Sequence, residues 1–273
     1  MTAMGPGRIL TIIVAAALAA SSLACSKRRE RRVEDKAFLS DEVLYQKGLK
    51  ELSNHNLRKA REYLERIQFS PERLADLQPM VRLAMADITF YHGDDLSLIE
   101  ARSKYLDFVT LNGDHPMAPY AQFQAGVCSL EQVNHPSKDQ GETRSAISDL
   151  KETLRRYPLS YYAQAAQDMI DVAESNLAEH DFIVGRFYHK RKVPLAASER
   201  YRRALDRYPR YRHREKLYFY LGRSLLEGNK DAEASAYLER LMSDYPESSF
   251  AKDARKFLAT FPGSKKGDSK EKK

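Results

Sequence analysis

A repeated spacing of apolar and small residues runs through the chain. An alanine is followed by a bulky residue four positions later, and then by Tyr-Pro at positions eleven and twelve. Spacings of four and seven place apolar side chains on one face of a helix, and proline ends that helix. The pattern therefore predicts amphipathic helices that stop at Tyr-Pro. It occurs three times: at Ala146, Leu150, Tyr157 and Pro158; at Ala197, Tyr201, Tyr208 and Pro209; and at Ala234, Leu238, Tyr245 and Pro246.

A second helix is predicted before each of these helices. Gly222 lies twelve residues before Ala234, and Gly48 lies twelve residues before Ala60. Small residues at these points allow two antiparallel helices to approach closely, and the polar residues 228–231 supply a turn between them. Gly126 lies twenty residues before Ala146, so the third pair contains eight extra residues, which we place in a loop at 133–141.

Helix pairs that repeat with glycine, alanine and proline at fixed offsets resemble tetratricopeptide repeats. The resemblance implies an all-α solenoid of about five helix pairs with a C-terminal capping helix, over residues 42–261. The expected repeats are 42–71, 79–116, 118–158, 161–209 and 213–246, and the expected capping helix is 247–261. The lysine-rich tail at 262–273 is predicted to be disordered.

The N-terminal residues predict export. Residues 1–24 have one charge, Arg8, followed by an apolar run too short to span a membrane, which is typical of a secretory signal peptide. The sequence Ser-Leu-Ala before Cys25 resembles the lipobox of bacterial lipoproteins, whose cysteine becomes lipidated. We therefore expect a lipid anchor on Cys25 and a polar tether over 25–41. The alternative is an ordinary signal peptide with an incidental cysteine.

The charge of the chain is concentrated in one block. The whole chain carries a net charge of +7, yet residues 186–216 alone carry +9, from twelve basic and three acidic residues. Because these cations repel one another, the block is predicted to be a docking face for an acidic partner. A solvated helix surface is the alternative. Export makes nucleic acid an unsuitable partner.

No catalytic or metal-binding motif stands out. The seven histidines form no metal-ligand pair, and there is no P-loop, dinucleotide fingerprint or G-x-S-x-G motif. Cys128 lies in an apolar helical context and is read as a small buried side chain. The prediction is therefore a non-enzymatic protein without a cofactor or metal.

The stretch from Asn176 to Arg210 resembles the BamD family, the tetratricopeptide lipoproteins of the β-barrel assembly machinery. The matching residues are Leu177-Ala178, Phe187-Tyr188, Lys190-Arg191-Lys192, Ala196, Arg200 and Tyr208-Pro209. The resemblance implies a lipid-anchored protein on the periplasmic face of the outer membrane. Its C-terminal repeats would dock on the POTRA domains of a BamA-like barrel subunit, and its N-terminal repeats would bind unfolded outer-membrane proteins.

Candidate binding residues follow from these two roles. The expected POTRA-binding residues are Arg200, Arg191, Lys192 and Arg203. Arg200 is expected to project from the edge of its helix, where replacement by Glu would leave stability nearly unchanged. Helical spacing makes Tyr45, Leu49 and Leu52 candidates for a client-binding groove, and the same spacing fits a packed core equally well. Another envelope adaptor, acting in cell-wall coordination or in pilus or polysaccharide secretion, is the alternative function.

Overall fold

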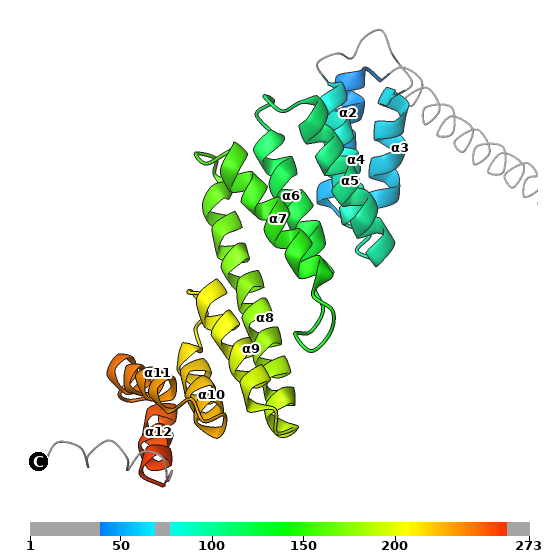
Figure 1. Cartoon of the computed structure of the whole chain (residues 1–273). Coiled ribbons are helices and arrows are strands. Elements are labelled where there is room, and N and C mark those ends of the chain that lie inside the picture. Colours follow the sequence, from blue (N-terminus) through cyan, green and yellow to red (C-terminus); the bar gives the residue numbers. More distant parts are fainter. Residues whose placement is uncertain (1–38, 69–76, 261–273) are drawn as a thin grey trace, which may run out of the picture. The chain divides into compact units, whose positions relative to one another are not determined.

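The computed structural model describes residues 39–68 and 77–260. They form eleven helices and no strand. The helices are Asp41–Ser53 (α2), Leu57–Gln68 (α3), Gln78–Phe90 (α4), Asp95–Leu111 (α5), Ala118–Glu131 (α6), Gly141–Arg156 (α7), Tyr162–Lys190 (α8), Pro194–Arg207 (α9), Arg214–Glu227 (α10), Asp231–Asp244 (α11) and Ser249–Thr260 (α12) (Figure 1). This succession of helices, with no strand in the described residues, confirms the predicted all-α tetratricopeptide fold.

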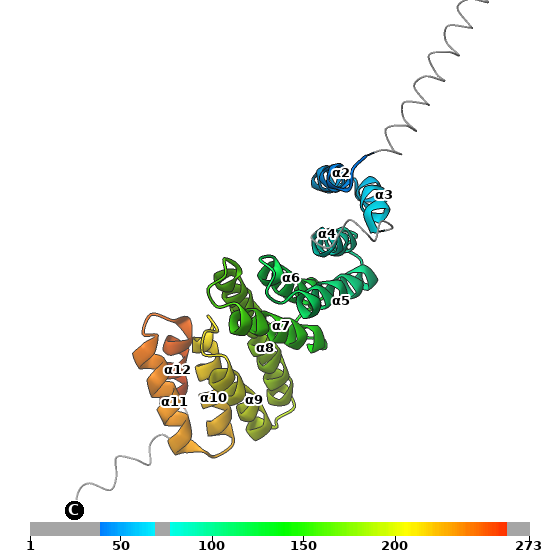
Figure 2. The ribbon, with the colours of Figure 1, turned by 90° about the horizontal axis from the view of Figure 1, so that it is seen from above.

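The predicted signal peptide, Cys25 and most of the tether lie outside the described residues, as does the lysine-rich tail. The chain divides into two compact units, one ending at Ile88 and one beginning at Thr89. In the first unit, α2, α3 and α4 share one core that contains Leu44, Leu64, Ile67 and Val81. In the second unit, α12 packs against both α10 and α11. Figure 2 shows α9 to α12 as a succession of neighbouring helices.

The Tyr-Pro pairs end three helices in the same way. Tyr157, Tyr208 and Tyr245 follow the last residues of α7, α9 and α11, and their ψ angles lie between 53° and 71°. Proline disfavours the helical conformation of the residue before it, which accounts for these common ends. Each tyrosine N–H still donates to the carbonyl four residues earlier.

The loops between paired helices are tight, with one exception. His55, Lys192 and Asn229 adopt left-handed φ angles of 57°, 59° and 57°, each two residues before the next helix begins. The exception is the third pair, in which the loop runs from 132 to 140, as the extra residues predicted. His180 Nδ1 of α8 lies 2.7 Å from the carbonyl oxygen of Pro136 and holds this loop against the helix.

Four glycines allow paired helices to approach closely. A Cβ atom added to any of them would come within 3.0 Å of a buried side chain on the partner helix. The glycines are Gly48, Gly126, Gly185 and Gly222, which face Leu64, Leu150, Tyr201 and Leu238 respectively. In three of the four pairs the facing residue comes sixteen positions later, so the same packing recurs in both units.

Each of these glycines is followed by an alanine on the partner helix of the same pair. Ala234 of α11 is completely buried. We expect Ala234→Leu to overpack the fifth pair and to lower the free energy of unfolding by about 1–3 kcal/mol, because the added methyl groups have no space. Thermal melting of this variant and of Ala232→Leu, an exposed position on the same helix, measures the effect. Equal melting temperatures would contradict this register.

The long helix α8 belongs to two hydrophobic clusters of the second unit. Its first half, with Ala166, Ile170 and Leu177, packs with residues of α6 and α7. Its second half, with Ala178 and Phe182, packs with residues of α9 to α12. In Figure 1 the helix runs past α7 and then beside α9. The basic block identified in the sequence lies on this second half and on the elements that follow it.

Candidate functional site

The centre of the basic block is a buried carboxylate. Asp181 lies on α8, is 4% exposed, and is held by two arginines one turn apart on α9. Arg203 donates through Nε to Asp181 Oδ2 at 2.9 Å and through Nη2 to Oδ1. Arg200 donates through Nη1 to Oδ1 at 3.4 Å. The hydrogen bonds that Arg203 donates to Asp181 raise the pKa of the Arg203 guanidinium above its ordinary value.

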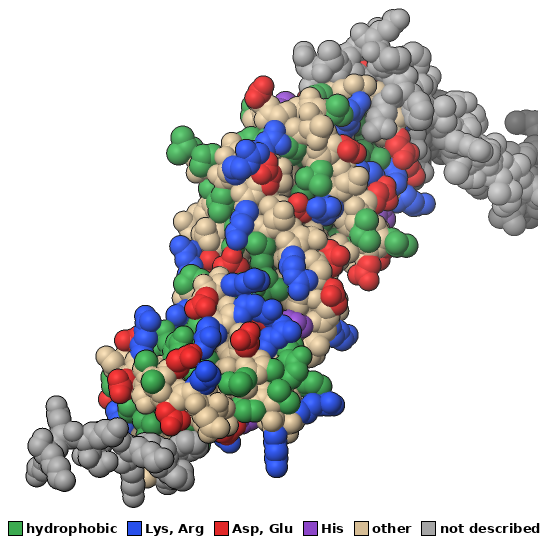
Figure 3. Space-filling model, in the orientation of Figure 1, with side chains coloured by type: hydrophobic (Ala, Val, Ile, Leu, Met, Phe, Trp, Pro, Cys, Tyr) green, Lys and Arg blue, Asp and Glu red, His purple; other side chains and the backbone are tan. Residues whose placement is uncertain are grey.

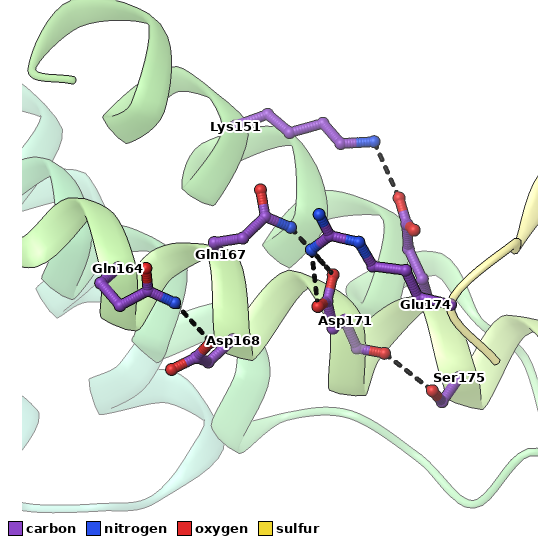
Figure 4. A network of polar contacts seen from close by, with 8 residues as sticks. Lys151, Gln164, Gln167, Asp168, Asp171, Glu174 and Ser175 are labelled. Atoms are coloured by element: carbon purple, nitrogen blue, oxygen red, sulfur yellow. Dashed lines mark hydrogen bonds and ion pairs between the residues drawn. The ribbon is translucent and has the colours of Figure 1, made fainter. Parts of the chain in front are cut away.

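Other cations of the block pair with acidic residues from outside it. Arg202 lies 2.7 Å from Glu233 of α11, and Arg210 lies 2.8 Å from Asp171 of α8. Figure 4 shows Asp171 on α8, where it also accepts a hydrogen bond from Gln167. One turn further along, Glu174 pairs with Lys151 of α7 at 2.9 Å.

Glu179 completes this set of acidic partners. It accepts from Lys216 Nζ at 2.6 Å and from the hydroxyl of Tyr211. Burial alone would raise the pKa of Glu179, but the hydrogen bonds from Lys216 and Tyr211 outweigh it and lower the pKa below its ordinary value. Lys216 also lies over the ring of Phe182, 4.2 Å from its centroid.

These contacts correct the argument from local charge. Five of the twelve cations form ion pairs with carboxylates that the chain itself supplies from α8 and α11. They are Arg200, Arg202, Arg203, Arg210 and Lys216. Figure 3 shows basic and acidic side chains interspersed over this part of the second unit. Self-repulsion along the sequence is therefore not evidence for an external acidic partner, because the opposing charges come from neighbouring helices.

Arg200 differs from its prediction in one respect. Its side chain is 32% exposed, so it reaches the surface as expected, but it also contacts the buried Asp181. Glu in its place would put a second carboxylate beside Asp181. We therefore expect Arg200→Glu to lower the stability rather than to leave it nearly unchanged, since like charges at a buried site are costly.

An open depression follows the outward face of α9. It has a volume of about 230 Å³ and is lined by Glu199, Arg202, Arg203, Asp206 and Arg207. Arg207 is exposed and has no carboxylate partner among the described residues. A surface with three arginines and two acidic residues is suited to a partner that offers both carboxylates and donors.

The remaining predicted binding residues lie elsewhere. Arg191 and Lys192 are exposed in the turn between α8 and α9, at the end of the helix pair. Tyr45 and Leu52 are 7% and 9% exposed in the core of the first unit, with Leu49 packed against that core. Tyr45 and Leu52 are therefore core residues rather than groove residues, because their face of α2 is the one that meets α3 and α4.

Burial also defines Cys128, which is completely buried in α6. Burial raises the pKa of its thiol to about 12. Within residues 39–68 and 77–260, no group of three or more His, Cys, Asp or Glu side chains could hold a metal ion. No helix in the described part of the chain has both the length and the apolar composition needed to cross a membrane.

Sequence reasoning missed the acidic half of this site. Asp181 is flanked on its helix face by the buried Ala178, Phe182 and Gly185. A carboxylate on a buried helix face needs a cation opposite, so the helical period alone pointed to a partner for Asp181. Glu179, Asp171 and Glu233 carry no comparable signal, because none of them lies at a fully buried helix position.

Comparison with known proteins places the chain in a family. The model of the YfiO family, described as outer membrane lipoprotein, matches residues 39–234. The chain belongs to this family. The matched range includes α2 to α10, the whole basic block at 186–216 and the Asp181 site.

Individual relatives carry the same description of function. The outer membrane protein assembly factor BamD of Caulobacter vibrioides is 26% identical over 252 residues, covering 92% of this chain and 81% of the relative. The protein of the same name from Rickettsia prowazekii is 24% identical over 219 residues, covering 80% and 86%. Among solved structures, the complex of the TPR2AB domain of yeast Sti1 aligns with a TM-score of 0.42 at 15% identity, covering 82% of this chain and 87% of that one.

Proposed function

We propose that the protein is an outer-membrane protein assembly factor, held at the membrane by a lipid on Cys25 and facing the periplasm. The observation that carries this proposal is the match to the BamD protein of Caulobacter vibrioides over 92% of this chain. On this proposal the protein is a scaffold without catalytic activity or cofactor. It binds the POTRA domains of a BamA-like barrel subunit and the unfolded outer-membrane proteins that this subunit inserts.

The α9 face is the part of the second unit that we assign to the POTRA partner. Arg200 and Arg203 are each about one-third exposed. A guanidinium has five N–H donors, so an arginine that holds Asp181 can also bind a carboxylate of a partner. Arg207 and the depression beside it extend the same surface. Because exposed charges are screened at high salt, binding here should weaken as salt rises.

A pull-down from the native envelope tests this function. The full-length, tagged chain is extracted in detergent and its partners are identified. Recovery of a POTRA-containing barrel protein, together with loss of outer-membrane barrels when the chain is depleted, is the expected result. Loss of pili or of septal integrity with normal barrel levels would instead support the other envelope adaptor roles.

A charge reversal on α9 tests the docking surface. We expect Arg207→Glu to weaken capture of the POTRA partner severalfold without lowering the melting temperature, since this side chain lines the depression and has no carboxylate partner to lose. Arg212→Glu, an equal charge change at an exposed position outside the depression, is the matched control. Equal loss of capture in both variants would mean that only net charge matters.

Removal of the lipidation site tests the anchor. We expect Cys25→Ser to leave the protein in the soluble periplasmic fraction, because the acyl chains that hold it at the membrane are attached to this residue. Fractionation and labelling with a fatty acid analogue measure the change. Label retained by the Cys25→Ser variant would show that the lipid is attached elsewhere.

A further inference from the structure

Three cations without a carboxylate partner among the described residues follow one another where α8 ends and the turn to α9 begins. Lys190, Arg191 and Lys192 are consecutive and exposed, and none of them forms an ion pair with a described residue. This separates them from Arg200, Arg202 and Arg203, each of which forms an ion pair with a carboxylate of α8 or α11. Three consecutive cations without a carboxylate partner therefore gather at this end of the α8–α9 pair, whereas Arg207 is a single such cation at the other end of α9.

Apolar side chains surround these cations. Phe187, Val193 and Leu195 are 50%, 45% and 47% exposed. The guanidinium of Arg191 lies over the ring of Phe187, 4.3 Å from its centroid. Charged and apolar side chains thus form one mixed surface, which we call the α8–α9 tip and define as residues 187 and 190–195. Exposed apolar side chains that gather in one place indicate a contact surface.

The backbone of the tip is fixed. Lys192 has a left-handed φ of 59°, and its N–H donates to the carbonyl of His189 at 3.0 Å. The N–H of Val193 donates to the carbonyl of Tyr188 at 3.1 Å, and Pro194 begins α9. In Figure 3 basic side chains project beside hydrophobic ones at the end of the α8–α9 pair. The tip is a protrusion, whereas the depression of this helix pair lies along α9.

We propose that the α8–α9 tip is a contact site for anionic phospholipid headgroups. A protruding turn with consecutive cations and half-exposed aromatic and aliphatic side chains fits a membrane surface, where the cations meet phosphates and the apolar groups enter the interface. Each lysine or arginine near an anionic surface strengthens binding roughly fivefold. An outer membrane lipoprotein also lies next to a membrane.

The charge balance favours lipid over an acidic protein at this tip. A docked protein would be oriented by ion pairs of fixed geometry, such as those around Asp181. The tip cations have no ion-pair partner of fixed geometry among the described residues, and a fluid headgroup layer requires none. Contact of the tip with lipid is a separate claim from assembly factor activity, and it can fail while the proposed function holds.

The absence of tryptophan from the chain allows a direct test. Phe187→Trp keeps an aromatic ring at the tip and makes it the single tryptophan of the full-length protein. The protein is reconstituted in phosphatidylcholine vesicles with or without phosphatidylglycerol, and tryptophan emission and quenching by brominated lipid are recorded. We expect a shift to shorter wavelength and severalfold stronger quenching when phosphatidylglycerol is present.

One double variant tests the cations of the tip, and two further variants are controls. Lys190→Glu with Lys192→Glu, in the Phe187→Trp background, should reduce quenching about tenfold or more. Arg207→Glu with Arg212→Glu makes the same change in net charge at the other end of α9 and should leave quenching intact. Tyr161→Trp places the single tryptophan at an exposed aromatic position in the loop between α7 and α8, and should show no dependence on phosphatidylglycerol.

The outcomes separate the possibilities. Equal quenching with and without phosphatidylglycerol, or equal effects of the two charge-reversed pairs, would overturn the proposal. A tip tryptophan that responds to the purified POTRA partner but not to anionic vesicles would also overturn it, and would assign the tip to protein docking. Loss of anionic-lipid contact in the tip variant, with normal capture of the POTRA partner, would support it.

Discussion

Gly185→Val should destabilise the second unit more than any other single replacement considered above. A Cβ atom at this position would collide with three ring atoms of Tyr201, which is completely buried and cannot turn away. Valine is stiff at its branched carbon, so α8 and α9 must separate. We expect a loss of about 3 kcal/mol or more in the free energy of unfolding, at the upper end of overpacking effects. Urea denaturation measures it.

A double-mutant cycle isolates the collision. Tyr201→Ala removes the ring and should itself cost about 3–5 kcal/mol. In that background Gly185→Val has space, and valine is a better helix former than glycine, so the second change should cost little or stabilise. An additive cycle would show that the close approach of α8 and α9 is not what Gly185 provides.

Arg203→Ala is the second replacement with a large expected effect. It removes both close donors of Asp181 and leaves that buried carboxylate with a single contact from Arg200 at 3.4 Å. Breaking a buried ion pair by removing one partner typically costs about 3–5 kcal/mol; because Arg203 is 36% exposed and water can follow, we expect about 2–3 kcal/mol here. The free energy of unfolding in urea is the measurement.

Removing Asp181 and removing Arg203 should lower the free energy of unfolding by different amounts, and this difference tests the interpretation of the site. Asp181→Ala leaves two arginines that can turn to solvent, so it should cost less than Arg203→Ala, and the double variant should cost little more than Asp181→Ala alone. Arg200→Glu should be destabilising as well, since it adds a carboxylate beside Asp181. If Asp181→Ala were the costlier of the two single variants, the carboxylate would be packing the core rather than requiring a counter-charge.

The helices and their ends could be predicted because their signals are local. Tyr157-Pro158, Tyr208-Pro209 and Tyr245-Pro246 each stop a helix through the geometry of one peptide unit. Glycine followed by alanine twelve residues later marked two helix pairs, at Gly48 and Gly222. Gly185 has the same spacing before Ala197 and was missed, although Ala197 and Tyr201 were themselves part of the repeated pattern; in the structure Gly185 faces Tyr201.

The ion pairs of the site could not be predicted in the same way. Arg203 meets Asp181 across 22 residues, Arg202 meets Glu233 across 31, and Arg210 meets Asp171 across 39. Each contact depends on the register between two helices, which a few side-chain volumes at the helix interface decide. A net charge counted along the sequence contains no such information, and it therefore overstated the free charge of α9.

The role of the apolar face of α2 could not be predicted from the sequence for a different reason. Tyr45, Leu49 and Leu52 recur at a helical period, which establishes that they share a face but not what that face meets. In the structure this face of α2 packs against α3 and α4 in the core of the first unit. Only the packing partners of a helix distinguish a core stripe from a binding stripe of the same composition.

The division of α8 between two clusters has a consequence for how the second unit loses its structure. Leu177 belongs to the cluster with α6 and α7, and the next residue, Ala178, belongs to the cluster with α9 to α12. Repeat arrays can usually open one repeat at a time, because neighbours meet only through side chains. Here the two clusters share a continuous ladder of backbone hydrogen bonds, so opening one cluster frays the helix that supports the other. The two clusters are therefore expected to unfold cooperatively. Cutting the chain at the midpoint of α8 would not give two modules that fold independently.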